Sequence, residues 1–301
     1  MFKNFLVPLD GSVMAESVLP AVAQLSALFK TRIILIHVIE KDAPQKIHGD
    51  RHLTDATQAQ IYLDKIASSA FTPELQVESH VHTAAIKNVA ESIVDHLSEF
   101  GNDLIIMCSH GHGGTRDLLF GSIAQQVVAL GTVPVLLFPS GREYYPEVRN
   151  WRRILVPLNE DPQHAQSIPF AVSLARIFQA SLHLLMVIPT YGKLSGDWVT
   201  TSRFLPSTTD RMLDEIEDEG LQYLKDYKYN LEQQGLSVNI NVLRGEPVEM
   251  ISQVTRQNNI DLLVLGTHGK VGTAGFWSGS ITPRICARCK IPLLLVPVSQ
   301  T

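Results

Sequence analysis

The sequence predicts an α/β protein made of two tandem doubly wound domains, each with a five-stranded, mainly parallel sheet flanked by helices. Three observations predict this fold. One long unit of sequence occurs twice in the same order. Within each unit, short apolar runs alternate with longer amphipathic stretches, as in βαβ units. Several of the apolar runs are continuous Val, Ile and Leu, which is typical of strands buried on both faces of a parallel sheet.

Three pairs of segments carry the repeat: FLVPLD and ILVPLN, NDLIIMCSHG and IDLLVLGTHG, and VPVLLFP and IPLLLVP. Each unit is far longer than a solenoid repeat, so we expect two domains and not a stacked array. A polar stretch with two prolines, PSGREYYPEVRN, separates the units. We therefore place the first domain at residues 1–140, a linker at 141–151 and the second domain at 152–301.

The elements of the first unit follow from its hydrophobic pattern. Strands are expected at the apolar runs Asn4–Leu9, Ile33–Ile39, Leu75–His82, Leu104–Cys108 and Val133–Phe138. Ala15–Lys30 and Lys87–Phe100 space their apolar residues at three and four positions, which predicts amphipathic helices. The second unit repeats this order, with a polar insertion at Tyr191–Asp210 before a long helix near Arg211–Gln233.

Composition bounds the class of protein. The chain has 301 residues, 45% of them hydrophobic, which is enough for two domains with buried cores. A net charge of −5 gives no sign of a nucleic-acid or membrane partner, since such partners favour a basic surface. Three cysteines do not make a disulfide framework. The N-terminus turns polar at Asp10 and no apolar run reaches membrane-spanning length, so we expect a cytoplasmic protein.

Both units place a glycine-rich turn between the fourth strand and the next helix. The second unit has GTHG, nine residues, then Gly279-Ser280; the first has CSHG, nine residues, then Gly121-Ser122. Ligands of open parallel sheets lie at the carboxyl ends of the strands, and a helix start offers backbone amides to phosphate. Such a turn can also merely connect a strand to a helix, but its fixed length in both units favours phosphate binding. Neither a Walker loop nor the GxGxxG dinucleotide fingerprint is present.

These residues resemble the universal stress protein family in its tandem two-domain form. Nucleotide-binding members carry Gly-x-x-Gly, nine residues, then Gly-Ser or Gly-Thr, and Gly266–Ser280 matches this in full. The family opens each domain with a strand ending in Val-Pro-x-Asp-x-Ser. Val7–Ser12 matches that pattern, whereas Val156–Asp161 departs from it at Asn159 and Asp161. The proline-containing closing strands also fit, and the resemblance covers nearly the whole chain.

The resemblance implies an adenine-nucleotide alpha hydrolase-like fold, binding of ATP or a related adenine nucleotide, and a role in stress survival or regulation. It leaves open whether magnesium or manganese accompanies the nucleotide. The implied second-domain site consists of Pro157, Asn159, Val187, Gly266, Thr267, Gly269, Gly279, Ser280, Ile281 and Thr282. A weaker first-domain site consists of Asp10, Val38, Gly111, Gly121 and Ser122. The resemblance places adenine near Val38 and Val187.

The two implied sites depart from the family pattern in different ways. The first unit keeps Asp10 but has Cys108 where the second has the first glycine of its turn. The second unit has Asn159 in place of the aspartate, and asparagine can still donate and accept hydrogen bonds. The Cys108 side chain could exclude the ribose, although a negative φ would make cysteine tolerable there. We therefore expect the second domain to be the better site, and Thr282 against Ala124 points the same way.

Two smaller features have a structural and a functional interpretation. Cys286 and Cys289 form a C-x-x-C motif near the end of a helix, and we expect buried thiols, not a redox pair or a zinc site. His110 and His268 recur before the middle glycine of each turn. They could contact phosphate or a metal, but we favour a role in packing the turn.

No paired carboxylates, Ser-His-Asp order or metal-ligand cluster is evident in the sequence, so we expect no catalytic or metal-binding residues and at most slow ATP hydrolysis. Asp103 and Asp261 recur before the fourth strands and are expected to cap or pair there. The first hypothesis is a regulatory nucleotide-binding protein with an unidentified protein partner. The alternative is an interaction or scaffold protein without nucleotide that pairs through its closing strands; an enzyme such as an adenylyl transferase ranks last. The two units are expected to form an internal pseudo-dimer, and the chain could dimerise again.

Overall fold

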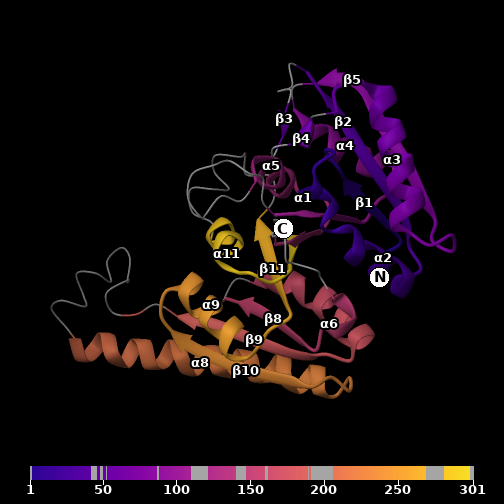
Figure 1. Ribbon diagram of the computed structural model, residues 1–301. Coiled ribbons are helices and arrows are strands. Elements are labelled where there is room, and N and C mark those ends of the chain that lie inside the picture. Colours follow the sequence, from indigo (N-terminus) through magenta and orange to yellow (C-terminus); the bar gives the residue numbers. More distant parts are fainter. Residues whose placement is uncertain are drawn as a thin grey trace. The chain divides into compact units, whose positions relative to one another are not determined.

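The computed structural model describes residues 2–41, 46–47, 50–51, 53–86, 88–109, 121–139, 147–159, 162–188, 190, 206–268 and 281–298. The chain divides into two compact units (Figure 1). The first comprises Met1–Asn150 and Thr267–Thr301, and the second comprises Trp151–Gly266. The predicted domains follow the repeat in the sequence, which is a different division of the chain, and their boundaries stay a prediction.

The first unit contains the parallel sheet that the sequence predicts for the first repeat. Its strands are β1 (Asn4–Pro8), β2 (Arg32–Glu40), β5 (Val77–Ile86), β6 (Leu104–Cys108) and β7 (Val135–Phe138). They lie in the order β7-β6-β1-β2-β5, and every pairing among them is parallel. The predicted α/β fold is therefore confirmed. A short antiparallel pair, β3 (Lys46–Ile47) and β4 (Asp50–Arg51), stands apart from this sheet.

The closing strands of the two repeats meet in the first unit. β12 (Leu293–Val298) runs antiparallel to β7, with Leu293 opposite Leu137 and Leu295 opposite Val135. These strands occupy equivalent places in the two repeats, so their pairing is the contact expected of an internal pseudo-dimer.

The described helices of the first unit are α1 (Val13–Glu16), α2 (Leu19–Phe29), α3 (Ala56–Ala70), α4 (Val89–Phe100), α5 (Ser122–Leu130) and α11 (Thr282–Arg288), with a 3₁₀ turn η1 at Val148–Asn150. The sequence predicted one helix over residues 15–30, but the structure has two. Pro20 lies in the first turn of α2, where proline fits because its missing N–H has no helical partner to lose.

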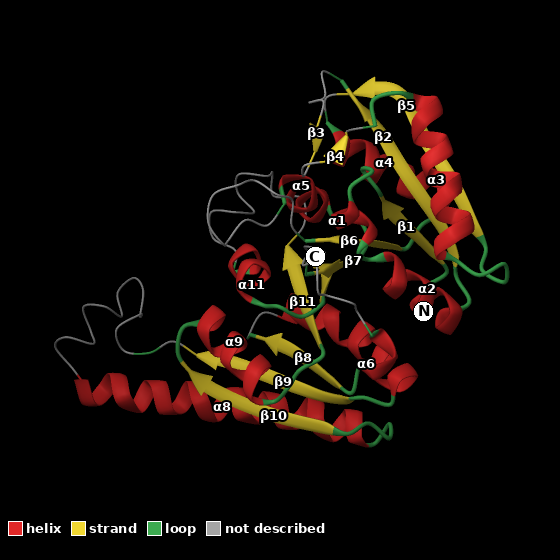
Figure 2. Ribbon diagram, in the orientation of Figure 1, coloured by secondary structure: helices red, strands yellow, loops and turns green. Residues whose placement is uncertain are grey.

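The second unit repeats the arrangement with four described strands. They are β8 (Arg153–Leu158), β9 (Ser181–Ile188), β10 (Val238–Arg244) and β11 (Leu262–His268), in the order β10-β9-β8-β11 and parallel throughout. The described helical segments are η2 (Pro162–Ser167), α6 (Ile168–Phe178), α8 (Pro206–Glu232) and α9 (Pro247–Gln257). The long predicted helix is α8, which begins five residues earlier than expected. Figure 2 shows helices lying beside the strands in both units.

Burial explains why the strands could be recognised. The three central residues of β1 are buried, as are all four residues of β7, as expected of strands that are covered on both faces of a parallel sheet. β10 ends the strand order of its unit and exposes every second residue over its first half. No helix among the described residues combines the length and apolarity needed to cross a membrane.

The two repeated aspartates anchor the first strand of each repeat. The Asp103 carboxylate accepts hydrogen bonds from the backbone amides of residues 3 and 4, at 2.7 and 3.1 Å. The Asp261 carboxylate accepts from the amides of residues 152 and 153, at 2.7 and 2.9 Å. The prediction that these side chains cap or pair beside the fourth strand is confirmed. Each fixes the amino end of a central strand whose other end carries candidate site residues.

Candidate functional site

The candidate residues of the first repeat lie along the carboxyl edge of its parallel sheet. Asp10 follows β1, Val38 lies near the end of β2, and Cys108 ends β6. Gly121 precedes the first residue of α5, and its amide donates a hydrogen bond to the Ser109 carbonyl at 2.8 Å. A backbone hydrogen bond therefore joins the residue after β6 to the residue before α5.

The segment after β1 is a tight polar turn. One oxygen of the Asp10 carboxylate accepts from both the amide and the hydroxyl of Ser12, at 2.9 and 2.6 Å. Gly11 between them has φ +86°, a conformation that favours glycine. The Ser12 hydroxyl in turn caps α1 by accepting from the Ala15 amide at 3.1 Å. The carboxylate of Asp10, a candidate residue of the first-repeat site, is thus held by hydrogen bonds within its own turn.

A tyrosine on α3 braces the same turn. The Tyr62 hydroxyl donates to Glu16 Oε1 at 3.0 Å, which ties α3 to α1. Burial and the neighbouring carboxylates of Glu16 and Asp10 raise the pKa of Tyr62, so the phenol stays neutral and remains a donor.

A buried histidine lies beside this turn, and the sequence analysis missed it. The His37 side chain is 2% exposed on β2, one residue before Val38. Its Nδ1 lies 2.7 Å from the Leu9 carbonyl oxygen, and its Nε2 lies 2.9 Å from the Leu53 carbonyl oxygen. The available signal was a single histidine inside the apolar run RIILIHVIE.

Cys108 differs from the glycine of the second repeat in its side chain and not in the backbone conformation that it requires. Cys108 is the last residue of β6, in register with Phe138 of β7, and it is half-buried. It is not among the residues with positive φ. Gly266 of the second repeat also lies within a strand, β11. The backbone at this position therefore tolerates cysteine. At this position the repeats differ by one added side chain at the edge of the sheet.

In the second unit, candidate residues also lie at the carboxyl ends of adjacent parallel strands. Pro157 is in β8 and Asn159 directly follows it, Val187 is in β9, and Gly266 is in β11. Because β8 pairs in parallel with both β9 and β11, these strand ends share one edge. The structure thus brings the four residues to the edge where open α/β sheets bind ligands.

The remaining second-repeat candidates have individual positions. The Thr267 hydroxyl donates to the Val296 carbonyl at 3.3 Å, so this side chain is engaged with the closing strand β12. Ile281 directly precedes α11, and Thr282 is the buried first residue of that helix. The helix expected near Ser280 therefore begins at Thr282. The candidates Gly111, Gly269, Gly279 and Ser280, and also His110, lie outside the described residues, whereas His268 ends β11.

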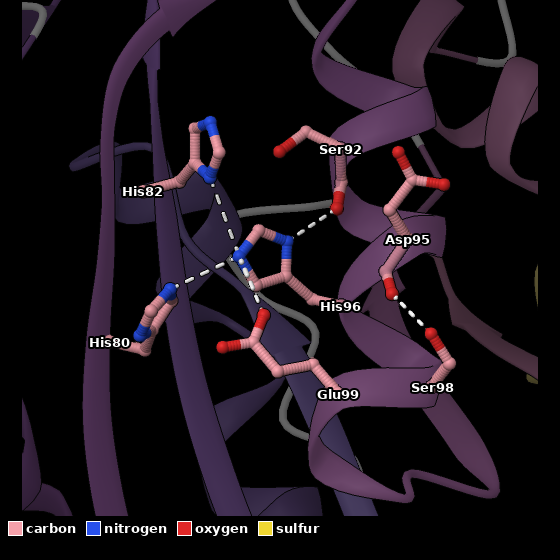
Figure 3. Close-up of polar contacts among 7 residues, drawn as sticks. All are labelled: His80, His82, Ser92, Asp95, His96, Ser98 and Glu99. Carbon is pink, nitrogen blue, oxygen red and sulfur yellow. Dashed lines mark hydrogen bonds and ion pairs between the residues drawn. The ribbon is translucent and has the colours of Figure 1, made fainter.

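A second polar constellation joins β5 to α4 (Figure 3). His96 Nδ1 donates to the Ser92 carbonyl at 2.6 Å, so its Nε2 carries the lone pair in the neutral ring. This Nε2 faces His80 Nε2 at 3.1 Å, His82 Nδ1 at 3.4 Å and Glu99 Oε2 at 3.5 Å. Burial, and then the neighbouring His96, lower the pKa of His80. The alternation His-Val-His on a strand was the signal that both rings share one face.

The contacts of this constellation connect two elements of the first unit. Within the described residues, no group of three or more His, Cys, Asp or Glu side chains is arranged to hold a metal ion. The three rings instead hydrogen-bond α4 to the last strand of the order β7-β6-β1-β2-β5.

The C-x-x-C motif is buried, as predicted. Cys286 and Cys289 are 1% and 7% exposed at the end of α11, and both are thiols. Burial, and then the neighbouring Cys289, raise the pKa of the Cys286 thiol. A buried thiol with a raised pKa is a poor nucleophile, which fits a packing role and not a redox role.

Comparison with known proteins identifies the family. The model of the Universal stress protein family matches residues 1–139 and 150–297. The Universal stress protein E homolog of Haemophilus influenzae is 24% identical over 271 residues, covering 85% of this chain and 78% of that protein. A universal stress protein of Synechocystis sp. is 30% identical over 139 residues, covering 46% of this chain and 87% of its own length.

Solved structures share the fold. A universal stress protein from Archaeoglobus fulgidus superposes with a TM-score of 0.71 at 18% identity, covering 98% of each chain. A universal stress protein solved in complex with cAMP covers 50% of this chain and 98% of its own, at 17% identity and a TM-score of 0.36, which is too low to place a site here. The two matched segments span both repeats, so the chain belongs to the universal stress protein family, in a tandem form with two such domains.

Proposed function

We propose that this chain is an adenine-nucleotide-binding regulatory protein of the stress response, with ATP as its ligand and the second repeat as its stronger site. The observation that carries the proposal is the complete glycine spacing of the second repeat, Gly266–Gly269, nine residues, Gly279-Ser280, which continues from a parallel strand. Glycines at these places let backbone amides approach phosphate oxygens without an intervening Cβ. A cytoplasmic location and an unidentified protein partner belong to the same proposal.

The sheet edge of the second unit supports this assignment. Pro157, Asn159, Val187 and Gly266 lie at or near the carboxyl ends of the neighbouring parallel strands β8, β9 and β11, which is the edge where a nucleotide would bind. Asn159 offers both a donor and an acceptor to the ribose or the base. The first repeat offers the same edge, but Cys108 adds a side chain to it.

We propose a regulatory role and not efficient catalysis. The Asp10 and Ser12 side chains bond to each other, and the Ser12 hydroxyl also caps α1. This pairing favours a turn-forming role over a nucleophile and its base. Any ATP hydrolysis should therefore be slow, and the nucleotide would act by ordering the turn and helix beside it.

The first experiment is a count of nucleotide released from the purified, denatured chain, identified by chromatography and mass spectrometry, with bound magnesium and manganese measured in parallel. Wild type is compared with the matched variants Gly279→Val and Gly121→Val. The proposal predicts a single ATP per chain that disappears with Gly279→Val and persists with Gly121→Val. Two nucleotides per chain would show that Cys108 is tolerated. No nucleotide, with no binding when ATP is added back, would contradict the proposal.

One observation favours the alternative function, an interaction or scaffold protein. The closing strands β7 and β12 pair antiparallel with each other, as expected of a protein assembled through these strands. In that case the glycine turns would be remnants and the chain would bind no nucleotide. The same nucleotide count separates the two functions.

A further inference from the structure

Three histidines join helix α4 to β5, the strand that ends the parallel order of the first unit (Figure 3). His80 and His82 share one face of β5, and His96 projects toward them from α4. His96 is 5% exposed, and its Nε2 lies 3.1 Å from His80 Nε2 and 3.4 Å from His82 Nδ1. We call these three residues the histidine joint. The joint connects the helix to the strand through ring nitrogens.

The contacts of the histidine joint fit neutral rings. His96 Nδ1 donates to the Ser92 carbonyl at 2.6 Å, because a carbonyl oxygen only accepts. A neutral His96 ring therefore presents a lone pair at Nε2, and this lone pair faces the nitrogens of both strand histidines. A neutral His80 or His82 ring can donate its single N–H to that lone pair. A protonated His96 presents an N–H instead, and a strand histidine can accept it only while that histidine stays neutral.

Two charged rings in the joint repel each other. The ring centroids of His80 and His82 lie 4.8 and 5.0 Å from that of His96, so two imidazolium charges would be nearest neighbours. Like charges that close in a part-buried site strongly disfavour each other. Burial, and then the neighbouring His96, lower the pKa of His80, so that ring resists protonation in the closed joint.

One carboxylate of α4 faces the joint. Glu99 Oε2 lies 3.5 Å from His96 Nε2, but the Glu99 side chain is 58% exposed, so solvent screens its attraction for a protonated ring. The other acidic residues of α4 are Glu91 and Asp95, and the Asp95 side chain points away from the rings in Figure 3. A screened carboxylate offsets one added charge more readily than two.

The other elements around the joint add little charge. On β5, Glu78 shares the face of the histidines and is paired with Arg32 of β2 at 3.3 Å. The β2 residues in register with the two strand histidines are Ile36 and Val38, and β1 and α5, which pack against α4, carry no ionisable side chain. Because α3 connects β2 to β5 and α4 leads from β5 to β6, right-handed crossovers place α3 and its charged residues on the opposite face of the sheet.

The second repeat has no such joint. The registers of the first three strands in each repeat place Asn241 and Leu243 of β10 where β5 has its two histidines. Val254 of α9 precedes Asp261 by the same number of residues as His96 precedes the equivalent aspartate. None of these three side chains can take up a proton in the range where histidines titrate. The second repeat is therefore an internal control for the first.

We propose that the histidine joint is a proton-operated latch, which holds α4 against β5 while its rings are neutral and releases the helix when more than one ring is protonated. This response to acid goes beyond nucleotide binding and does not depend on it. The closed joint binds protons more weakly than free histidines do. The latch is therefore closed above the ordinary histidine pKa of about 6.5 and opens as the pH falls through and below that value.

Hydrogen exchange followed by mass spectrometry measures the latch in the full chain without ligand. Protection is compared at pH 7.5 and pH 5.5, after correction for the intrinsic dependence of amide exchange on pH. Each proton taken up only on opening shifts the opening equilibrium by up to about tenfold per pH unit. The inference predicts that the amides of α4 lose about tenfold or more in protection at pH 5.5 and that those of α9 lose much less. Unchanged protection of α4, or an equal loss in α4 and α9, would overturn it.

Variants of the two strand histidines separate the latch from a general effect of acid. In the double variant His80→Gln/His82→Gln, each glutamine amide can still donate a hydrogen bond but takes up no proton. This chain should keep α4 protected at pH 5.5, whereas the control His183→Gln, in the second unit, should leave the acid response of α4 unchanged. The single variants serve if the double variant fails to fold, and each should reduce the response. A response as large in these variants as in wild type would overturn the inference.

The protonation states are read in the wild-type chain labelled with ¹⁵N-histidine, with ring signals assigned from the single variants. At pH 7.5 the inference predicts a His96 ring with its proton on Nδ1 and a lone pair on Nε2. The protection of α4 should fall in the pH range where the rings of the joint take up protons. Three protonated rings at pH 5.5 with α4 still protected would overturn the inference.

Discussion

The two repeats keep one fold but differ in which part of the candidate site is built. The first repeat has a polar turn in which Asp10 and Ser12 bond to each other, and His37 clamps the residue before it. The second repeat keeps every glycine of the family spacing but has Met186 where the first has His37. The comparison teaches that two copies of one fold can diverge at single positions of the same sheet edge, where one copy carries a hydrogen-bonded polar turn and the other a complete glycine spacing.

The largest expected effect comes from exchanging one residue between the repeats. Gly266→Cys places in the second repeat the side chain that the first carries at Cys108, and both positions lie in strands, so the fold should persist. We expect ATP affinity at the second repeat to fall at least about tenfold, which corresponds to about 1.4 kcal/mol. The reciprocal Cys108→Gly should raise occupancy of the first repeat. Equilibrium dialysis with ATP measures both, and unchanged affinity in both variants would show that Cys108 has no part in the asymmetry.

The next effect concerns stability and should be alike in the two repeats. Asp103→Ala and Asp261→Ala each remove a carboxylate that accepts two backbone amide hydrogen bonds at the start of a central strand. Because these bonds are exposed or only partly buried, we expect about 1–2 kcal/mol loss in the free energy of unfolding for each. Hydrogen exchange should locate the loss in β1 for the first variant and in β8 for the second. Loss spread evenly over both repeats would contradict the assignment of each aspartate to its own strand.

A smaller effect is the pH dependence of unfolding. Burial, and then the neighbouring His96, lower the pKa of His80 in the first unit. Burial, and then the neighbouring Arg153, lower the pKa of His183 in the second unit. A histidine whose pKa is lowered on folding binds its proton more weakly in the folded chain. Its contribution is therefore complete above the ordinary pKa of about 6.5 and is lost as the pH falls through that value.

Denaturant melts between pH 7.5 and 5 check this sign. His80→Gln and His183→Gln should each flatten the acid side of the stability profile. Equal loss of stability between pH 7 and 5 in wild type and in both variants would contradict the lowered pKa of these two histidines.

The smallest effect isolates the brace on the first-repeat turn. Tyr62→Phe removes the hydroxyl that donates to Glu16 and keeps the ring. We expect a loss of about 1 kcal/mol in the free energy of unfolding, since the partner carboxylate can be solvated in place of the phenol. Thermal unfolding of Tyr62→Phe beside the control Tyr229→Phe, at an exposed position, measures it. Equal losses of stability in the two variants would show that the hydrogen bond from Tyr62 to Glu16 does not stabilise the turn.

Most of the fold could be predicted because buried strands and helices require recognisable patterns of apolar residues in the sequence. β6 lies at the predicted residues 104–108, since a strand covered on both faces needs a continuous apolar run. α3 was missed, although Ala59, Leu63 and Ile66 follow the helical spacing of buried residues. The candidate residues Asp10 and Gly121 could be located beside a strand end and a helix start because local spacing defines those places, and their role as a site stays a prediction. His37 could not be assigned a role, because its partners at Leu9 and Leu53 are backbone carbonyls brought together only by the fold.

The central claim is that the chain binds adenine nucleotide with unequal repeats. Native mass spectrometry of the wild-type chain and of Gly266→Cys, titrated with ATP, tests it most directly. The account predicts that wild type takes up one ATP at low concentration and a second only at higher concentration, and that Gly266→Cys loses the first of these. A wild-type chain that stays without nucleotide at every ATP concentration, or that fills both sites together, would contradict it.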